Sequence, residues 1–208
     1  IHNGANYIVT QLCYDARKFQ ELLMFLKQNN CDIPVLGSVY ILSAPAARFM
    51  NKGNVPGIHV SDKLLDQVQA EAKMADKGRS AFLERAAKMM AILKGLGYRG
   101  AHLAGMAKYP EIKGVIARFN EIKDNWKEFL VEFDFPYAGG FYLYEKDEET
   151  GLNSDAEAKK APKRLGSRLN MAQMGVFHNL MFEPKAKHFG MLKAMAKFVD
   201  KHCVLKKM

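Results

Sequence analysis

The sequence predicts an α/β protein built from parallel strand–helix units, and three observations support that prediction. Short β-branched segments alternate with helical periodicity, the links between them are short, and hydrophobic residues form 49% of the 208 residues. This alternation is typical of βα units whose strands run parallel. The same composition excludes a disordered chain, and no run approaches the roughly 20 apolar residues of a membrane-spanning helix.

Strands are expected at residues 6–14, 34–41 and 98–105, because each segment is short and rich in β-branched, aromatic or small side chains. Since βα crossovers connect neighbouring strands, we expect the three strands to be parallel and adjacent in this order. Three strands cannot close a barrel and would leave bare edges, which favours a piece of a larger α/β domain.

Helical periodicity predicts helices at residues 16–29, 44–50, 61–73, 79–96, 110–123 and 126–133. Asp15, Ser43 and Ser61 stand before the first three of these as N-caps, and Gly97 ends the fourth. The later part of the chain is expected to hold a short strand at 141–144, an exposed loop at 145–163 and helices at 165–182 and 191–201.

The positive charge lies at the C-terminal end of the chain. Residues 159–208 hold twelve Lys and Arg against two acidic residues, whereas the whole chain carries a net charge of +9. Such a segment suits an anionic cofactor, an acidic partner or nucleic acid, or it is simply solvated. No RNA-binding motif or zinc-finger spacing supports nucleic acid. Cys13, Cys31 and Cys203 have no metal-ligand spacing, and their odd number favours free thiols in a reducing cytoplasm.

Gln11 is the most informative polar residue of the first expected strand. It stands near the carboxyl end of an apolar segment, where ligands of parallel α/β folds bind. A buried amide costs free energy unless it is hydrogen-bonded. Its donor and acceptor suit the edge of a pterin or a flavin, and a hydrogen bond to a neighbouring strand or to water is the structural alternative.

His102 on the third strand faces either a ligand or the core. His59 and His178 have no carboxylate or thiol at a metal-ligand spacing, so no metal site is expected. Gly37 and Gly105 near strand ends allow a ligand to approach the backbone or simply form turns. The sequence contains no glycine-rich phosphate motif and no GxSxG nucleophile turn.

Several strings along the chain resemble methylenetetrahydrofolate reductases. Residues 3–15 (NGANYIVTQLCYD) resemble the sixth strand of that family, and residues 33–43 (IPVLGSVYILS) resemble its seventh. Residues 55–57, 75–79 and 96–102 resemble the segment that follows and the eighth strand. Residues 140–147 and 182–184 are similar to an extension in a longer bacterial and archaeal branch, where a cysteine-rich module often comes next.

The resemblance implies the C-terminal portion of a (β/α)8 TIM barrel with a mostly helical C-terminal extension. Residues 1–134 would form the last three βα units, and residues 135–208 would form the basic extension. The implied reaction is the flavin-dependent reduction of 5,10-methylenetetrahydrofolate to 5-methyltetrahydrofolate, with FAD as cofactor. A nicotinamide nucleotide or another donor would supply the electrons, and an oligomer without nucleic acid or membrane is expected.

The resemblance also assigns roles to three residues of this chain. Gln11 would contact the folate pterin, and Phe49, after a one-residue gap, would stack on folate or nicotinamide. His102 would lie on the flavin side, whereas the catalytic Glu of the family lies on a strand outside this chain. The alternative is a non-catalytic partial barrel that docks a methyltransferase or an electron-transfer partner. A visible flavin spectrum would support the enzyme, and a colourless protein that binds a partner would support the alternative.

Overall fold

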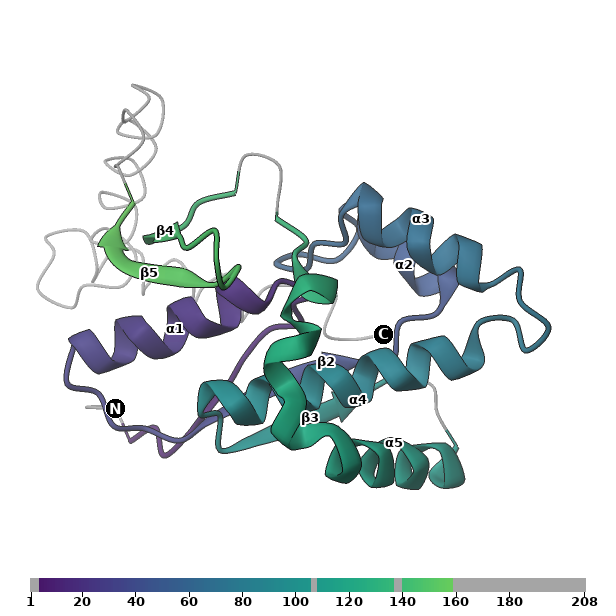
Figure 1. The fold of residues 1–208 in the computed structure, drawn as a ribbon, viewed down its shortest axis with the longest axis horizontal. Coiled ribbons are helices and arrows are strands. Elements are labelled where there is room, and N and C mark those ends of the chain that lie inside the picture. Colours follow the sequence, from purple (N-terminus) through teal and green to yellow (C-terminus); the bar gives the residue numbers. More distant parts are fainter. Residues whose placement is uncertain (1–3, 106–107, 137–139, 159–208) are drawn as a thin grey trace, which may run out of the picture. The chain divides into compact units, whose positions relative to one another are not determined.

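Three strands lie side by side in one parallel sheet, in the order β1 (Ile8–Val9), β2 (Val35–Tyr40) and β3 (Gly100–Ala104). The computed structural model describes residues 4–105, 108–136 and 140–158, which belong to one compact unit, Ile1–Ala158 (Figure 1). The expected parallel and adjacent order of the strands is therefore confirmed. The helices expected at 165–182 and 191–201, and the basic segment 159–208, lie outside the described residues.

β1 is shorter and more exposed than expected. The prediction of a buried strand over residues 6–14 is wrong, because only Ile8–Val9 is strand and Val9 is 45% exposed. Among the described strands β1 pairs with β2 alone. The pairing ends after Thr10, whose N–H donates to the Leu36 carbonyl oxygen at 3.0 Å.

The helices that the sequence predicts in the first 133 residues are present. They are α1 (Ala16–Gln28), α2 (Ala44–Asn51), α3 (Asp62–Glu71), α4 (Arg79–Leu96), α5 (Tyr109–Ile122) and the 3-10 helix η1 (Lys123–Phe133). Asp15 and Ser61 cap α1 and α3 through side-chain hydrogen bonds, whereas Ser43 makes none. Gly97 ends α4 with a φ of +105°, which an L side chain rarely adopts. None of the described helices is long and apolar enough to cross a lipid bilayer.

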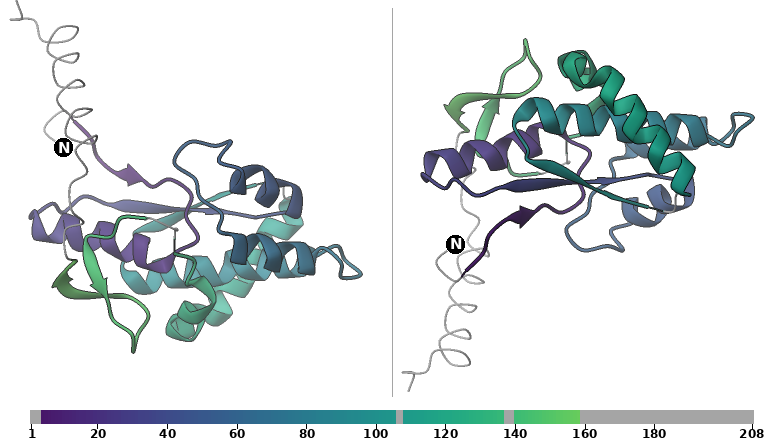
Figure 2. Two further views of the ribbon diagram at one scale, coloured as in Figure 1. Left: turned by 90° about the horizontal axis from the view of Figure 1, so that it is seen from above. Right: turned by 90° about the horizontal axis from the view of Figure 1, so that it is seen from below.

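α4 lies at the centre of the core. It is buried on several sides, because α1, α5, η1 and the strands β2 and β3 all pack against it. A Cβ atom at Gly37 would lie 2.5 Å from the Leu93 side chain, so this face of β2 meets α4 directly. Gly37 therefore serves helix packing. Because strand side chains alternate, Ser38 and its partner His102 point to the other face of the sheet, and Figure 2 shows α1 and α4 together on one face.

Residues 140–158 form a small hairpin of β4 (Tyr144–Lys146) and β5 (Asn153–Glu157), paired antiparallel. The expected strand at 141–144 is displaced toward the C-terminus, and the expected exposed loop at 145–163 is wrong over its described part. Leu152 and Asn153 are buried. The hairpin forms because α1 offers polar side chains to its backbone, as when Gln20 Oε1 accepts the Asn153 N–H at 2.7 Å.

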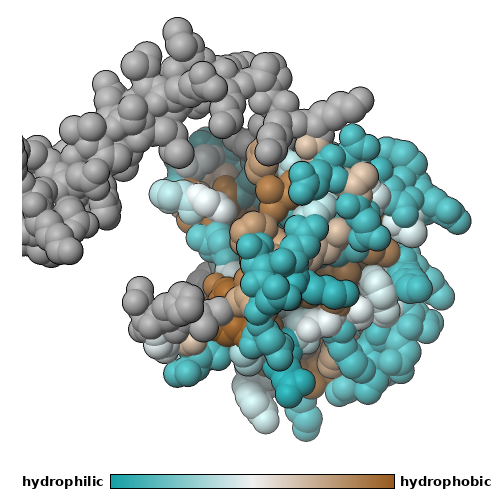
Figure 3. All heavy atoms as spheres, turned by 90° about the vertical axis from the view of Figure 1, so that its left-hand side faces the viewer, coloured by the Kyte–Doolittle hydropathy of each residue, from teal (hydrophilic) through white to brown (hydrophobic). Residues whose placement is uncertain are grey.

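A hollow of about 850 Å³ lies at the amino ends of β2 and β3, where α1 ends. Both apolar and polar side chains line it, among them Leu26, Ile33, Lys27 and Arg99. Figure 3 shows apolar side chains recessed between hydrophilic ones on this side of the molecule. Ligands of parallel α/β folds bind at the carboxyl ends of the strands, so this hollow is not the candidate site.

Two helical glycines should respond to alanine with opposite signs. Nothing lies within 4 Å of a Cβ added at Gly114, so Gly114→Ala should gain about 0.5–1 kcal/mol of stability from helix propensity. A Cβ at Gly95 would overlap the Trp126 ring, so Gly95→Ala should lose about 1–3 kcal/mol through overpacking between α4 and η1. Urea unfolding measures both variants, and equal stabilisation of the two would contradict the packing of Trp126.

Candidate functional site

Gln11 lies just beyond β1, at the carboxyl end of the parallel sheet, and its side chain is exposed. Its Oε1 accepts the N–H of Leu12 at 3.0 Å, and its Nε2 donates to the Pro56 carbonyl oxygen at 3.5 Å. An amide has two N–H donors and two lone pairs on its oxygen. Counting the described residues, one donor and one lone pair of Gln11 therefore remain for a ligand.

A cavity of about 270 Å³ opens beside Gln11 at this end of the sheet. Its walls come from the end of β1 and the start of α1, from the loop between α2 and α3, and from the chain around the β4–β5 hairpin. The lining residues are Gln11, Leu12, Cys13, Tyr14, Asp15, Lys18, Gly57, His59, Phe135 and Tyr142. The volume is slightly below the roughly 300 Å³ of the smallest drug-like pockets, so it suits the ring end of a ligand better than a whole dinucleotide.

Cys13 and His59 in the cavity wall are neutral at neutral pH. Burial raises the pKa of Cys13 to about 11, so its thiol stays protonated and is a poor nucleophile. The Cys13 sulfur also accepts the Asp15 N–H at 3.4 Å. Partial burial lowers the pKa of His59, and the nearby Asp62 carboxylate opposes that shift. A neutral imidazole can both donate and accept a hydrogen bond.

Asp15 connects the start of α1 with residues 140–158, the segment that contains the hairpin. Its Oδ1 accepts the Arg17 N–H at 2.9 Å as the N-cap of α1, and its Oδ2 accepts the hydroxyl of Tyr142. Burial raises the pKa of Asp15, while the hydrogen bonds from Tyr142 and from the Arg17 backbone oppose the rise. The carboxylate is 4% exposed and so is fixed by these two partners.

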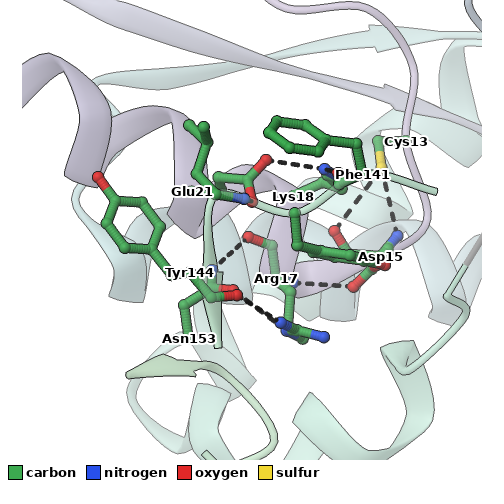
Figure 4. Close-up of polar contacts among 10 residues, drawn as sticks. Cys13, Asp15, Arg17, Lys18, Glu21, Phe141, Tyr144 and Asn153 are labelled. Carbon is green, nitrogen blue, oxygen red and sulfur yellow. Dashed lines mark hydrogen bonds and ion pairs between the residues drawn. The ribbon is translucent and has the colours of Figure 1, made fainter. Parts of the chain in front are cut away.

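Arg17 is buried beneath the hairpin and binds it at two points (Figure 4). Its Nε donates to Asn153 Oδ1 and its Nη2 to the Tyr144 carbonyl oxygen, both at 3.1 Å. In return the Asn153 amide donates to the Arg17 carbonyl oxygen at 2.8 Å. One turn later, Glu21 Oε2 accepts the Leu143 N–H at 2.6 Å. The hairpin is therefore held on α1 next to the cavity.

His102 lies on β3 opposite Ser38, and its Nδ1 is 3.4 Å from Ser38 Oγ. The Ser38 hydroxyl donates to the Thr10 carbonyl oxygen at 2.7 Å, so it can only accept from His102. The His102 side chain is exposed, which argues against a core histidine. Gly105 ends β3 with a φ of +117°, and a Cβ there would lie 3.1 Å from the Ile41 backbone, so it serves a turn.

Of the three residues assigned from the sequence, Gln11 alone lines the cavity. Phe49 lies on α2 with its side chain 55% exposed, and neither Phe49 nor His102 is part of the cavity wall. Sequence reasoning missed His59 and Tyr142. The turn-rich stretch before His59 was a usable signal, whereas nothing local indicated Tyr142, which lies 127 residues from its partner Asp15.

Within the described ranges, no group of three or more His, Cys, Asp or Glu side chains could hold a metal ion. The arrangement at the carboxyl end of β1 instead presents the Gln11 amide beside three aromatic side chains, Tyr14, Phe135 and Tyr142. Such a set can bind a planar, polar organic molecule through its edge and its face. It presents no activated nucleophile.

The chain was compared with protein-family models and with curated proteins. A search of curated proteins finds no match to the chain. Residues 1–120 match the family model described as methylenetetrahydrofolate reductase, and this stretch contains the parallel sheet, α1 to α4 and Gln11. The match supports an oxidoreductase that acts in folate-linked reduction. Because it covers more than half of the chain, the protein belongs to the methylenetetrahydrofolate reductase family.

Proposed function

We propose that this chain binds the folate in the flavin-dependent reduction of 5,10-methylenetetrahydrofolate to 5-methyltetrahydrofolate. The observation that carries the proposal is the half-satisfied amide of Gln11, placed at the mouth of a cavity at the carboxyl end of β1. Family membership supports a folate as the ligand. A nicotinamide nucleotide or another donor would supply the electrons, and Phe49 remains a proposed stacking residue.

The chemistry of the cavity suits the pterin end of a folate. A pterin carries a donor and an acceptor side by side on its edge, and the Gln11 amide can meet both at once. The ring of Phe135, which is 5% exposed, and the ring of Tyr142 give aromatic walls. This chain's own contribution is therefore to bind and orient the substrate, and none of its described residues is assigned as catalytic.

His102 and Ser38 do not fit FAD by themselves. His102 and Ser38 provide one imidazole and one committed hydroxyl on the open face of the sheet. A dinucleotide pyrophosphate is usually held by a glycine-rich turn at a helix N-terminus or by cationic side chains. These two residues supply neither, so no step through the flavin is derived from them, and the role of His102 on the flavin side stays a proposal.

Gln11→Ala should weaken binding of 5-methyltetrahydrofolate by about 5- to 150-fold. A polar group left without its partner costs about 1–3 kcal/mol, which corresponds to that range in the dissociation constant. Gln11→Glu should be milder, because one acceptor oxygen is kept. Isothermal titration of the full chain with 5-methyltetrahydrofolate measures the effect.

Gln69→Ala on α3 is the matched control, because it removes the same amide from a helix residue outside the cavity wall. This variant should bind the folate like the wild type. Unchanged affinity in Gln11→Ala would mean that Gln11 is a structural residue. Equal weakening in the two variants would mean that the loss is not specific to the cavity.

A second candidate function is a non-catalytic partial barrel that docks a methyltransferase or an electron-transfer partner. The first strand favours it, since β1 has one partner strand among the described residues, and Tyr7 and Val9 beside that edge are 62% and 45% exposed. Exposed strand edges readily pair with another chain. A purified protein with flavin absorbance supports the enzyme, and a colourless protein that binds a partner without folate affinity supports docking.

A further inference from the structure

The hairpin segment lies outside the matched residues 1–120 and yet supplies a wall of the cavity beside Gln11. That wall is the half-buried ring of Tyr142. The Arg17 guanidinium carbon and the Lys18 ammonium each lie 4.1 Å from the centre of this ring. Its hydroxyl donates to Asp15. These contacts hold the ring in the cavity wall.

The groups that fix the ring are themselves fixed. Lys18 forms an ion pair with Glu21 at 2.7 Å and also donates to the Phe141 carbonyl oxygen (Figure 4). Arg17 is tied to the hairpin backbone and to Asn153. A binding surface whose side chains are already ordered loses less conformational entropy when a ligand arrives. The position of Tyr142 is thus prepared before binding.

We propose that Tyr142 contacts the planar ring of the ligand that Gln11 holds by its edge, which makes residues 140–158 part of the substrate site. The proposal rests on the proposed function, because it takes the same folate as ligand. Aromatic rings pack favourably against planar heterocycles in offset or edge-on arrangements. The Tyr142 hydroxyl donates to Asp15, so the contact proposed here is made by the ring and not by the hydroxyl.

The test compares two substitutions of Tyr142 by titrating 5-methyltetrahydrofolate into the full chain. Tyr142→Leu removes the ring and should weaken binding by about 2- to 12-fold, the range of an aromatic contact. Tyr142→Phe keeps the ring and removes the hydroxyl that donates to Asp15, so its affinity should stay close to that of the wild type. Rescue by phenylalanine is a result that a purely structural role through Asp15 does not give.

Tyr144→Phe is the matched control on the same hairpin. It removes a hydroxyl that donates to Gln28 Oε1 at 2.6 Å, away from the cavity, and it should leave folate affinity unchanged. Equal weakening in Tyr142→Phe and Tyr142→Leu would overturn the ring contact. A loss in Gln11→Ala without a loss in Tyr142→Leu overturns this inference alone, whereas a wild-type chain that binds no folate overturns the proposed function and this inference together.

Discussion

Replacing Glu71 with alanine should lower the free energy of unfolding by about 3–5 kcal/mol, the cost of breaking a buried ion pair by removing one partner. Glu71 at the end of α3 pairs with Arg85 on α4, and their side chains are only 12% and 9% exposed. The Arg85 Nη1 atom already lacks a hydrogen-bond partner among the described residues. Without Glu71, the whole guanidinium would be a buried charge with no counter-charge from α3.

Glu84→Ala provides the comparison for this variant. Glu84 also pairs with an arginine, Arg118, but the two side chains are 34% and 45% exposed. Exposed pairs contribute about 0–1 kcal/mol, because water replaces the lost partner. Urea unfolding of both variants measures the difference. Similar small losses in the two would mean that Arg85 reaches solvent once Glu71 is gone.

The parts of the fold that the sequence predicts well are those encoded locally. The N-cap at Asp15 and the glycine at position 97 act through bonds and dihedral angles within a few residues. The parallel order of the strands follows from short βα links, which leave few topologies. The length of β1 could not be derived in this way, because burial of residues 6–14 depends on what covers the edge of the sheet.

The hairpin of β4 and β5 was missed for a physical reason. Its residues are polar, and a polar stretch with turn formers is typical of a loop. The partners that order it are Arg17, Gln20 and Glu21 on α1, more than 120 residues away in sequence. The hydrophobic periodicity of a sequence does not predict a hydrogen bond between residues so far apart in the chain. A buried arginine at the start of a helix is the one signal, since charged side chains are rarely buried without partners.

In the candidate site, too, the sequence predicts local features and misses those that depend on distant contacts. Gln11 could be assigned from its place near the end of an apolar strand, and the structure puts it beside a cavity. His59 and Tyr142 reach that cavity from a loop and from the hairpin segment, so only the three-dimensional fold brings them there. Where a site is assembled from several distant segments, sequence alone identifies the strand residue and misses the others.

Arg17→Ala should lower the free energy of unfolding by about 3 kcal/mol and release the hairpin from α1. Arg17 is 8% exposed and donates to Asn153 Oδ1 and to the Tyr144 carbonyl oxygen. Hydrogen bonds from a charged donor contribute about 1.5–3 kcal/mol each, and both acceptors would be left buried without it. Urea unfolding gives the stability, and amide hydrogen exchange gives the location of the change.

Amide hydrogen exchange shows whether Arg17→Ala opens the hairpin beside the cavity or destabilises the whole core. The Leu143 and Asn153 amides should exchange faster in Arg17→Ala, because the hairpin that their bonds to α1 hold would open locally. Amides of α4, in the centre of the core, should stay protected until global unfolding. Arg118→Ala removes an exposed arginine, so it should change the stability far less than Arg17→Ala and should leave the exchange of the hairpin unaltered. Uniformly faster exchange over α4 and the hairpin would show that Arg17 supports the whole core, in which case the hairpin is not a separately anchored wall of the cavity.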